Sequence, residues 1–340
     1  MSKWYQMKGA ENDVALCTKV TLARNVKGYP FTIKLPLQQR KEIEQKVTQV
    51  LESELPGKFR CMHMSDYTQD QAISLAERNL VSPEFVSSAG GRSFLCTEDE
   101  SLSIMLFEED HLKIQGLLPG LELKKAYELA DTLDTMLDEK LVFSYNDELG
   151  YLTQCPTNIG TAMRTSVFLH LPGLARSGQT GNLAMTVSKL GLILTGAYGE
   201  GASPRGDLYV LSNQVTLGIT EKSAIDNLAS ICTSVIEQER KARAKLFADI
   251  RYEDKFYRAL GTLENARILS FDELMDNISS IKLGLNDAPD TDIAADRINI
   301  LMYTMQPATI NSSKGLTLQR EERDVLRAEQ VRKVFSKKKE

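Results

Sequence analysis

The order of strand-like and helix-like segments is the feature that most constrains this fold. Strand patterns recur through the first two thirds of the chain, separated by single helical segments and glycine-rich turns, whereas the patterns from Glu221 onward are helical. Such a mixed order favours an α+β fold with a largely antiparallel sheet over a series of βαβ units. The expected strands cover residues 15–23, 101–114, 165–171, 190–195 and 207–212, and the expected helices cover 38–54, 121–141, 221 onward and 318–339.

The helix that begins at Glu221 carries an apolar stripe with a heptad-like spacing, which Glu239 interrupts. Two interpretations of this stripe stay open: an amphipathic helix packed on its own domain, or the seam of a dimer. The stripe consists of Ile225, Leu228, Cys232, Val235, Ala242 and Leu246.

The composition excludes several classes of protein. With 340 residues, 42% of them apolar, and a net charge of -5, the chain fits a globular protein without the basic face of a direct nucleic-acid binder. The N-terminal segment has no secretory pattern, and no apolar run approaches the roughly 18 residues of a membrane span, so we expect a cytoplasmic protein without membrane contact. The five cysteines form no CxxC pair, which predicts neither a zinc site nor a disulfide framework.

Three short segments carry residues suited to chemistry. Residues 108–111 (EEDH) place three acids and a histidine after the apolar run 103–107. Residues 155–161 (CPTNIGT) are followed by Arg164, and residues 196–201 (GAYGEG) place an acid between glycines. Each segment alone is weak, because an acidic strand end is usually a solvated edge and a glycine-rich turn usually only reverses the chain. His111 is open to two interpretations, a structural hydrogen-bonding residue or a proton shuttle.

Together these motifs resemble the phosphagen (ATP:guanidino) kinase family, most closely its bacterial protein-arginine kinases of the McsB type. The resemblance implies a phosphagen-kinase-like catalytic domain over residues 1–250, with a curved antiparallel sheet flanked by helices. Residues 251–340 would form a C-terminal helical domain for dimerisation and phosphoarginine binding, and the N-terminal helical domain of creatine and arginine kinases is not expected. The matching segments are VTLARN (20–25), EEDHLKIQ (108–115), YLTQCPTNIGTAMR (151–164), GAYGEG (196–201) and YVLSNQVTLG (209–218).

The resemblance also implies a role for the acids of EEDH. A guanidinium has a pKa above about 12 and is a poor nucleophile until it loses a proton, which a carboxylate that holds it by paired hydrogen bonds can accept. By resemblance Glu109 is the base and orienter, and Glu200 is the second carboxylate. Cys155, as a thiolate, would lie beside the guanidinium, and Glu108 would support the magnesium shell through water.

ATP and Mg²⁺ are the cofactors that the resemblance implies, and here the chain departs from the family pattern. Phosphoryl transfer relies on positive charge around the phosphates. Of the positions that correspond to phosphate-clamping arginines, only Arg164 keeps arginine, two carry lysine and two are neutral, with Arg205 as a candidate substitute. These positions are Lys19, Thr21, Lys113, Arg164 and Thr195.

Near the C-terminus, residues 323–328 (RDVLRA) match the motif through which the family's protein kinases bind phosphoarginine. The resemblance therefore assigns phosphoarginine binding to Arg323, Asp324 and Arg327. In a charged helix the same spacing also fits a solvated face with an ion pair, and both interpretations stay open.

Two functions from different classes follow. The first is a protein-arginine kinase that transfers the γ-phosphoryl group of ATP to arginine side chains of proteins in a bacterial stress response. The second is a catalytically weakened or inactive pseudokinase, an adaptor that reads arginine or phosphoarginine, which the altered phosphate positions suggest. A small-molecule arginine kinase is disfavoured. The partners that the resemblance implies are a Clp-type ATPase or protease, a heat-shock repressor, a zinc-containing activator and a second copy of the chain.

Overall fold

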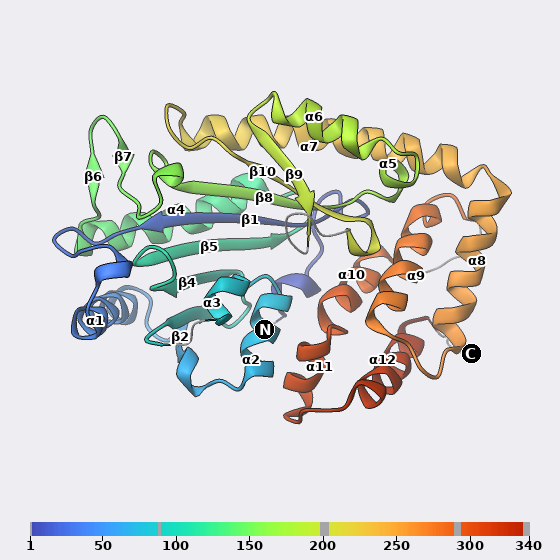
Figure 1. The fold of residues 1–340 in the computed structure, drawn as a ribbon, viewed down its shortest axis with the longest axis horizontal. Coiled ribbons are helices and arrows are strands. Elements are labelled where there is room, and N and C mark those ends of the chain that lie inside the picture. Colours follow the sequence, from blue (N-terminus) through green and yellow to red (C-terminus); the bar gives the residue numbers. More distant parts are fainter. Residues whose placement is uncertain (1, 88–89, 198–203, 289–293, 336–340) are drawn as a thin grey trace.

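The computed structural model describes residues 2–87, 90–197, 204–288 and 294–335. Its centre is an eight-stranded, fully antiparallel sheet, which confirms the expected α+β class (Figure 1). In their order across the sheet the strands are β2 (Phe59–His63), β3 (Ser93–Thr97), β4 (Leu102–Leu106), β5 (Leu112–Pro119), β1 (Ala15–Arg24), β8 (Met163–His170), β10 (Leu208–Asn213) and β9 (Leu192–Gly196). A separate hairpin consists of β6 (Tyr145–Asn146) and β7 (Gly150–Tyr151).

One face of the sheet is covered by five of the described helices, all from residues 37–247. Because strand side chains alternate between faces, Val20 and Leu22 of β1 enter this core while Lys19 and Thr21 face the opposite side. The apolar sides of the helices on this face supply the other half of that core. The helices around this face are α1 (Leu37–Glu54), α4 (Leu123–Leu141), α5 (Pro172–Arg176), α6 (Thr180–Ser188) and α7 (Glu221–Phe247).

The stripe of α7 packs against its own chain. Leu228, Cys232 and Val235 are buried in the core, which confirms the first of the two interpretations. Glu239 is buried because it accepts hydrogen bonds from the backbone amides of Gly173 (2.8 Å) and Leu174 (2.9 Å) at the start of α5. The interruption in the stripe is therefore the residue that fixes α5 to α7.

The opposite face of the sheet is partly covered by a second core. Cys17, Leu117 and Phe168 at one end of the central strands pack with apolar residues of the C-terminal helices. Figure 1 shows these helices grouped beside the sheet. The other end of the same strands is free of this cluster. The helices on this side are α2 (Gln69–Glu77), α3 (Pro83–Ser87), α8 (Ile250–Asn265), α9 (Phe271–Gly284), α10 (Ala295–Thr304), α11 (Pro307–Lys314) and α12 (Arg320–Phe335).

The segment expected as a strand over 101–114 is two strands, β4 and β5, joined by a tight turn at 107–111. Phe107 adopts a positive φ of 63°, and its amide donates to the carbonyl oxygen of His111 at 3.0 Å. The acids of EEDH thus lie in a hairpin turn instead of at the end of a strand. Among the described residues, no helix combines the length and the apolar character needed to cross a membrane.

Candidate active site

A pocket of about 390 Å³ lies at the end of the central strands that the second core leaves free. It is enclosed by the 107–111 turn, by the segment that follows Cys155, and by three neighbouring strands. Sequence segments more than a hundred residues apart therefore meet in one site. Its lining residues are Thr21, Ala23, Glu108, Glu109, Asp110, Lys113, Cys155, Thr157, Asn158, Ala162, Met163 and Arg164.

Glu109 is the half-buried acid of the turn that faces this pocket. The side-chain amide of Asn158 donates to its Oε2 at 3.3 Å. Burial, followed by the charge of Asp110, raises the pKa of Glu109 above its ordinary value. A carboxylate with a raised pKa is a stronger base, so Glu109 suits the acceptance of a proton from a weakly acidic group.

Asp110 holds the turn in place. Its Oδ1 accepts hydrogen bonds from the Asn25 side chain at 2.7 Å and from the Gln154 amide at 2.8 Å. These contacts join the acidic turn to the end of β1 and to the residue before Cys155. Sequence reasoning gave no role to Asp110, Asn25 or Asn158, although all three lie inside the motifs that carry the family resemblance.

Glu108 is the more buried neighbour of Glu109. Its Oε2 lies 2.5 Å from Lys113 Nζ, and its Oε1 accepts a hydrogen bond from the Ser82 hydroxyl. Burial alone would raise the pKa of Glu108, but the charge and hydrogen bond of Lys113 and the Ser82 contact hold it below its ordinary value. Glu108 therefore stays ionised, and much of the charge of Lys113 is engaged within the protein.

His111 is a structural residue of the turn. It is fully buried, its Nδ1 accepts from the Val26 amide at 3.0 Å, and its Nε2 lies 2.8 Å from the Pro30 carbonyl oxygen. Burial lowers its pKa, so the neutral ring with a proton on Nε2 satisfies both contacts. This supports the structural interpretation over the proton shuttle.

Cys155 brings a thiol to the same pocket as Glu109. It precedes a single 3-10 turn, Pro156–Asn158, and its Sγ lies 3.0 Å from the Thr157 hydroxyl oxygen. The turn explains the spacing of the CPTN motif, since one short element presents both the sulfur and the amide that contacts Glu109. Glu200, the predicted second carboxylate, lies outside the described residues.

Strand register explains how the predicted phosphate positions relate to the pocket. Thr21 of β1 pairs with Arg164 of β8, and Ala23 of β1 pairs with Lys113 of β5. Paired residues share a face of the sheet, so Thr21, Lys113 and the exposed Arg164 all line the pocket. The Thr21 hydroxyl donates to the Arg164 carbonyl oxygen at 3.1 Å, which fixes the start of β8.

Lys19 lies two residues before Thr21 on the same face of β1, just beyond the pocket lining. Its ammonium group is 5.5 Å from the centroid of the Phe168 ring. Burial lowers the pKa of Lys19, and the charges of Lys113 and Arg164 lower it further. This cluster of cations is suited to an anionic ligand that would relieve their mutual repulsion.

Two predicted phosphate positions lie apart from the pocket lining. Thr195 on β9 pairs with Val210 of β10, which separates it from β8 by one strand. Arg205 Nε lies 3.0 Å from Asp272 Oδ1 in the first turn of α9, and neither Thr195 nor Arg205 lines the pocket.

The RDVLRA segment forms part of α12 and contacts its own chain closely. Arg327 is 1% exposed and donates to the carbonyl oxygens of Met305 (2.8 Å) and Leu269 (2.9 Å) and to Asp324 Oδ1 (2.5 Å). The Asp324–Arg327 ion pair exists, but Arg327 is buried and does not lie on a solvated face. Arg323 and Asp324 retain partial exposure.

An acid, a thiol and basic strand residues around one pocket of an antiparallel sheet fit a guanidino phosphotransferase. The chain belongs to this family: residues 42–242 match the ATP:guanido phosphotransferase C-terminal catalytic domain, and the chain is a kinase of that class. Residues 249–340 match the C-terminal domain of the protein-arginine kinase McsB.

Individual relatives extend this assignment along almost the whole chain. The chain is 40% identical to the protein-arginine kinase of Desulforamulus reducens over 337 residues, which covers 97% of this chain and 94% of that protein. It is 37% identical to the protein-arginine kinase of Halothermothrix orenii, covering 98% and 96%. Among solved structures, it is similar to the duplicated taurocyamine kinase of Schistosoma mansoni with bound transition state analog components, with a TM-score of 0.60 and 26% identity over 68% of this chain and 34% of that one.

Proposed function

We propose that this protein transfers the γ-phosphoryl group of ATP to arginine side chains of proteins. The observation that carries the proposal is the meeting of Glu109, Cys155 and Arg164 in one pocket. An acid and a thiol suit a guanidinium, and a neighbouring arginine suits the phosphate that it attacks. The relatives that match nearly the full chain are named protein-arginine kinases.

Glu109 acts first on the substrate. Its carboxylate accepts hydrogen bonds from the guanidinium and directs one nitrogen at the phosphate. That nitrogen forms a bond to the γ-phosphorus of ATP and gives its proton to Glu109, while the bond from the phosphorus to the βγ-bridging oxygen breaks and ADP leaves. Asn158 keeps Glu109 in place, and Glu200 is proposed as the second carboxylate.

Cys155 is proposed to lie beside the guanidinium as a thiolate, where its negative charge polarises the reacting nitrogens. The 3-10 turn after it fixes the sulfur relative to Asn158 and therefore relative to Glu109. A thiolate next to a cation is stabilised by that cation, so binding of the substrate would itself favour the reactive form.

Arg164, Lys19 and Lys113 are proposed to hold the phosphates of ATP. Mg²⁺, when bound with ATP, neutralises phosphate charge. Both carboxylate oxygens of Glu108 already contact protein groups, which fits a water-mediated role toward the metal better than direct coordination. Arg164 and the two lysines lie on one sheet face and bring positive charge to the phosphates, although only one of the three is an arginine and Lys113 shares its charge with Glu108. The relatives named protein-arginine kinases, which match nearly the whole chain, favour the enzyme over the adaptor alternative.

Incubation with MgATP and an arginine-rich protein tests this function, with phosphoarginine detected by mass spectrometry at neutral pH. We expect phosphoarginine with the wild type and a loss of about 10²–10⁴ in rate with Glu109→Gln. Glu128→Gln, which removes an exposed acid of α4, is the matched control and should retain the activity. Absence of phosphoarginine with the wild type, while an active relative produces it, would refute the proposal.

The resemblance also supports proposals about partners. We propose a cytoplasmic homodimer formed through residues 251–340 that acts in the stress response with a Clp-type ATPase or protease, a heat-shock repressor and a zinc-containing activator. Arg323 and Asp324 are the partly exposed residues of the proposed phosphoarginine-binding segment, while Arg327 supports them from within the helix packing. Sedimentation of the whole chain tests the dimer, and a monomer at all concentrations would contradict it.

A further inference from the structure

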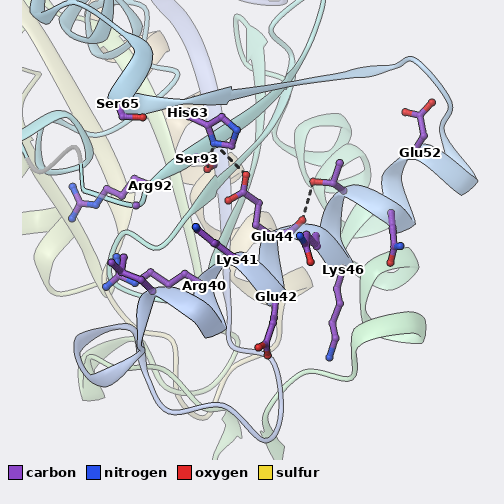
Figure 2. A pocket seen from close by; sticks show the side chains of 15 residues that line it. Arg40, Lys41, Glu42, Glu44, Lys46, Glu52, His63, Ser65, Arg92 and Ser93 are labelled. Atoms are coloured by element: carbon purple, nitrogen blue, oxygen red, sulfur yellow. Dashed lines mark hydrogen bonds and ion pairs between the residues drawn. The ribbon is translucent and has the colours of Figure 1, made fainter.

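A second pocket, of about 1170 Å³, lies along α1 beside the edge strand β2. It shares no lining residue with the catalytic pocket. Figure 2 shows Glu44 of α1 and His63 of β2 pointing toward each other across this pocket, with Ser93 behind the histidine. The proposed kinase reaction gives this place no role.

Three side chains with different metal-binding atoms converge at the edge of this pocket, and two of them, Glu44 and His63, line it. Cys61 and His63 are two residues apart on β2, so they share the strand face that looks toward α1. His63 Nδ1 lies 3.3 Å from Glu44 Oε1, and Cys61 Sγ lies 3.8 Å from the same oxygen. The three ligand atoms all lie within 4.8 Å of one another.

The two separations measured from Glu44 Oε1 match those around a single tetrahedral cation. Zinc bonds of about 2.0–2.2 Å to nitrogen and oxygen and about 2.3 Å to sulfur imply about 3.4 Å between nitrogen and oxygen, and about 3.6 Å between sulfur and oxygen. The nitrogen–oxygen separation of 3.3 Å and the sulfur–oxygen separation of 3.8 Å both agree with these values within a few tenths of an ångström. Cys61 and Glu44 are partly buried and His63 is exposed, so a cation has access from the pocket.

We propose that Glu44, Cys61 and His63 form a binding site for a zinc-class divalent cation. A thiolate and an imidazole favour zinc over the hard cation Mg²⁺, which prefers oxygen ligands alone. Cys61 binds as the thiolate and releases its proton to water, and a water molecule fills the fourth position on the pocket side. Since the ligands come from α1 and β2, the cation ties the edge strand to that helix.

The imidazole of His63 is the accessible metal-binding group of this cluster. Ser93 Oγ lies 3.1 Å from His63 Nδ1, the same ring nitrogen that faces Glu44. Of the three histidines in the chain, His63 alone is exposed, while His111 and His170 are fully buried. A metal titration of the chain therefore reports on one accessible imidazole.

Titration of the full chain with Co²⁺ alone tests this site, because cobalt bound to a thiolate gives a charge-transfer absorption band. We expect one Co²⁺ per chain with this band, displaced by added Zn²⁺. Cys61→Ser should abolish the band, and Glu44→Gln should weaken binding. Glu52→Gln, which changes another acid of α1 that lines the same pocket, is the matched control and should bind as the wild type does.

Two further measurements keep the test decisive. His63→Gln changes an exposed side chain that cannot disturb the core, and it should weaken Zn²⁺ binding by more than the roughly tenfold that loss of an outer hydrogen-bond partner costs. Zn²⁺ should raise the melting temperature of the wild type and not that of Cys61→Ser. A wild type without the thiolate band, or a band that Cys155→Ser removes and Cys61→Ser does not, would overturn the proposal.

Discussion

Replacing Lys113 by methionine tests how charge is arranged behind the catalytic turn. Lys113 Nζ is 2.5 Å from Glu108 Oε2, and the side chains are 32% and 8% exposed, respectively. Methionine keeps the length and the apolar stem of lysine but removes the cation. Among the described residues, the buried carboxylate of Glu108 then keeps the hydrogen bond from the Ser82 hydroxyl and the more distant charge of Arg92.

The loss in free energy of unfolding that we expect for Lys113→Met lies between two limits. Breaking a fully buried ion pair by removing one partner costs about 3–5 kcal/mol, whereas an exposed pair contributes about 0–1 kcal/mol. Because Glu108 is buried and Lys113 is one third exposed, we expect Lys113→Met to lower the free energy of unfolding by about 2 kcal/mol at neutral pH. The double variant Glu108→Gln with Lys113→Met should recover most of this loss, since no unpaired charge remains.

The pH dependence of this cost has a definite sign. The pKa of Glu108 is depressed in the folded wild type, so its contribution to stability is present above the unfolded pKa of about 4.3 and is lost as pH falls through the folded value. In Lys113→Met, burial instead favours the protonated acid. The difference between wild type and variant should therefore be largest near pH 7 and shrink toward acid.

Urea denaturation followed by circular dichroism measures this difference as a shift in midpoint with an unchanged slope. Lys124→Met, at an exposed lysine of α4, is the matched control and should leave the midpoint nearly unchanged. A Lys113→Met protein as stable as the wild type at pH 7, or a double variant no more stable than Lys113→Met, would refute the reasoning.

Three further perturbations test other parts of the structure. Burial and a neighbouring carboxylate raise the pKa of Glu109, so the phosphorylation rate should fall as pH drops through that raised pKa, and an acid limb that survives in Glu109→Gln would contradict this role. Arg327→Met removes a buried guanidinium with three acceptors and should cost about 3–5 kcal/mol in urea denaturation, against less than about 1 kcal/mol for Arg323→Ala. Burial, then the charge of Arg243, lowers the pKa of Lys282 to about 7. The wild type should therefore gain stability relative to Lys282→Met as pH rises from about 7 toward about 10. A difference in the free energy of unfolding between the two proteins that does not change over this pH range would contradict this.

Local patterns were enough to predict most of the elements. The alternation of apolar and polar residues predicted β1, and a 3.6-residue period of apolar residues predicted α1 and α4, within a few residues of their observed ends. Their order also predicted the antiparallel sheet. These features depend on neighbours along the chain, which a sequence pattern records directly.

The turn at 107–111 could not be predicted in the same way. It contains no glycine or proline to mark a reversal, and Phe107 has to adopt a positive φ. The turn is held by Asp110 and His111, which contact Asn25, Val26 and Pro30 from a distant part of the chain. Contacts of this range leave no periodic signal in the sequence.

The sequence predicted several of the residues that form the catalytic pocket, but not how those residues are buried or paired. The family resemblance supplied Glu109, Cys155 and Arg164, and the pocket contains all three. The burial of Arg327 and the pairing of Lys113 with Glu108 depend on how helices and strands pack, and so could not be read from motifs. The Glu44, Cys61 and His63 cluster was missed for the same reason, since its ligands come from separate elements without a CxxC spacing.

A crystal structure of the protein with Mg-ADP and an arginine-containing peptide tests the central claim most directly. We expect the guanidinium of the peptide between the Glu109 carboxylate and the Cys155 sulfur, with the nucleotide phosphates contacting Arg164 and Lys19. A guanidinium bound elsewhere, or phosphates held by a different face of the sheet, would contradict the proposed chemistry of this pocket.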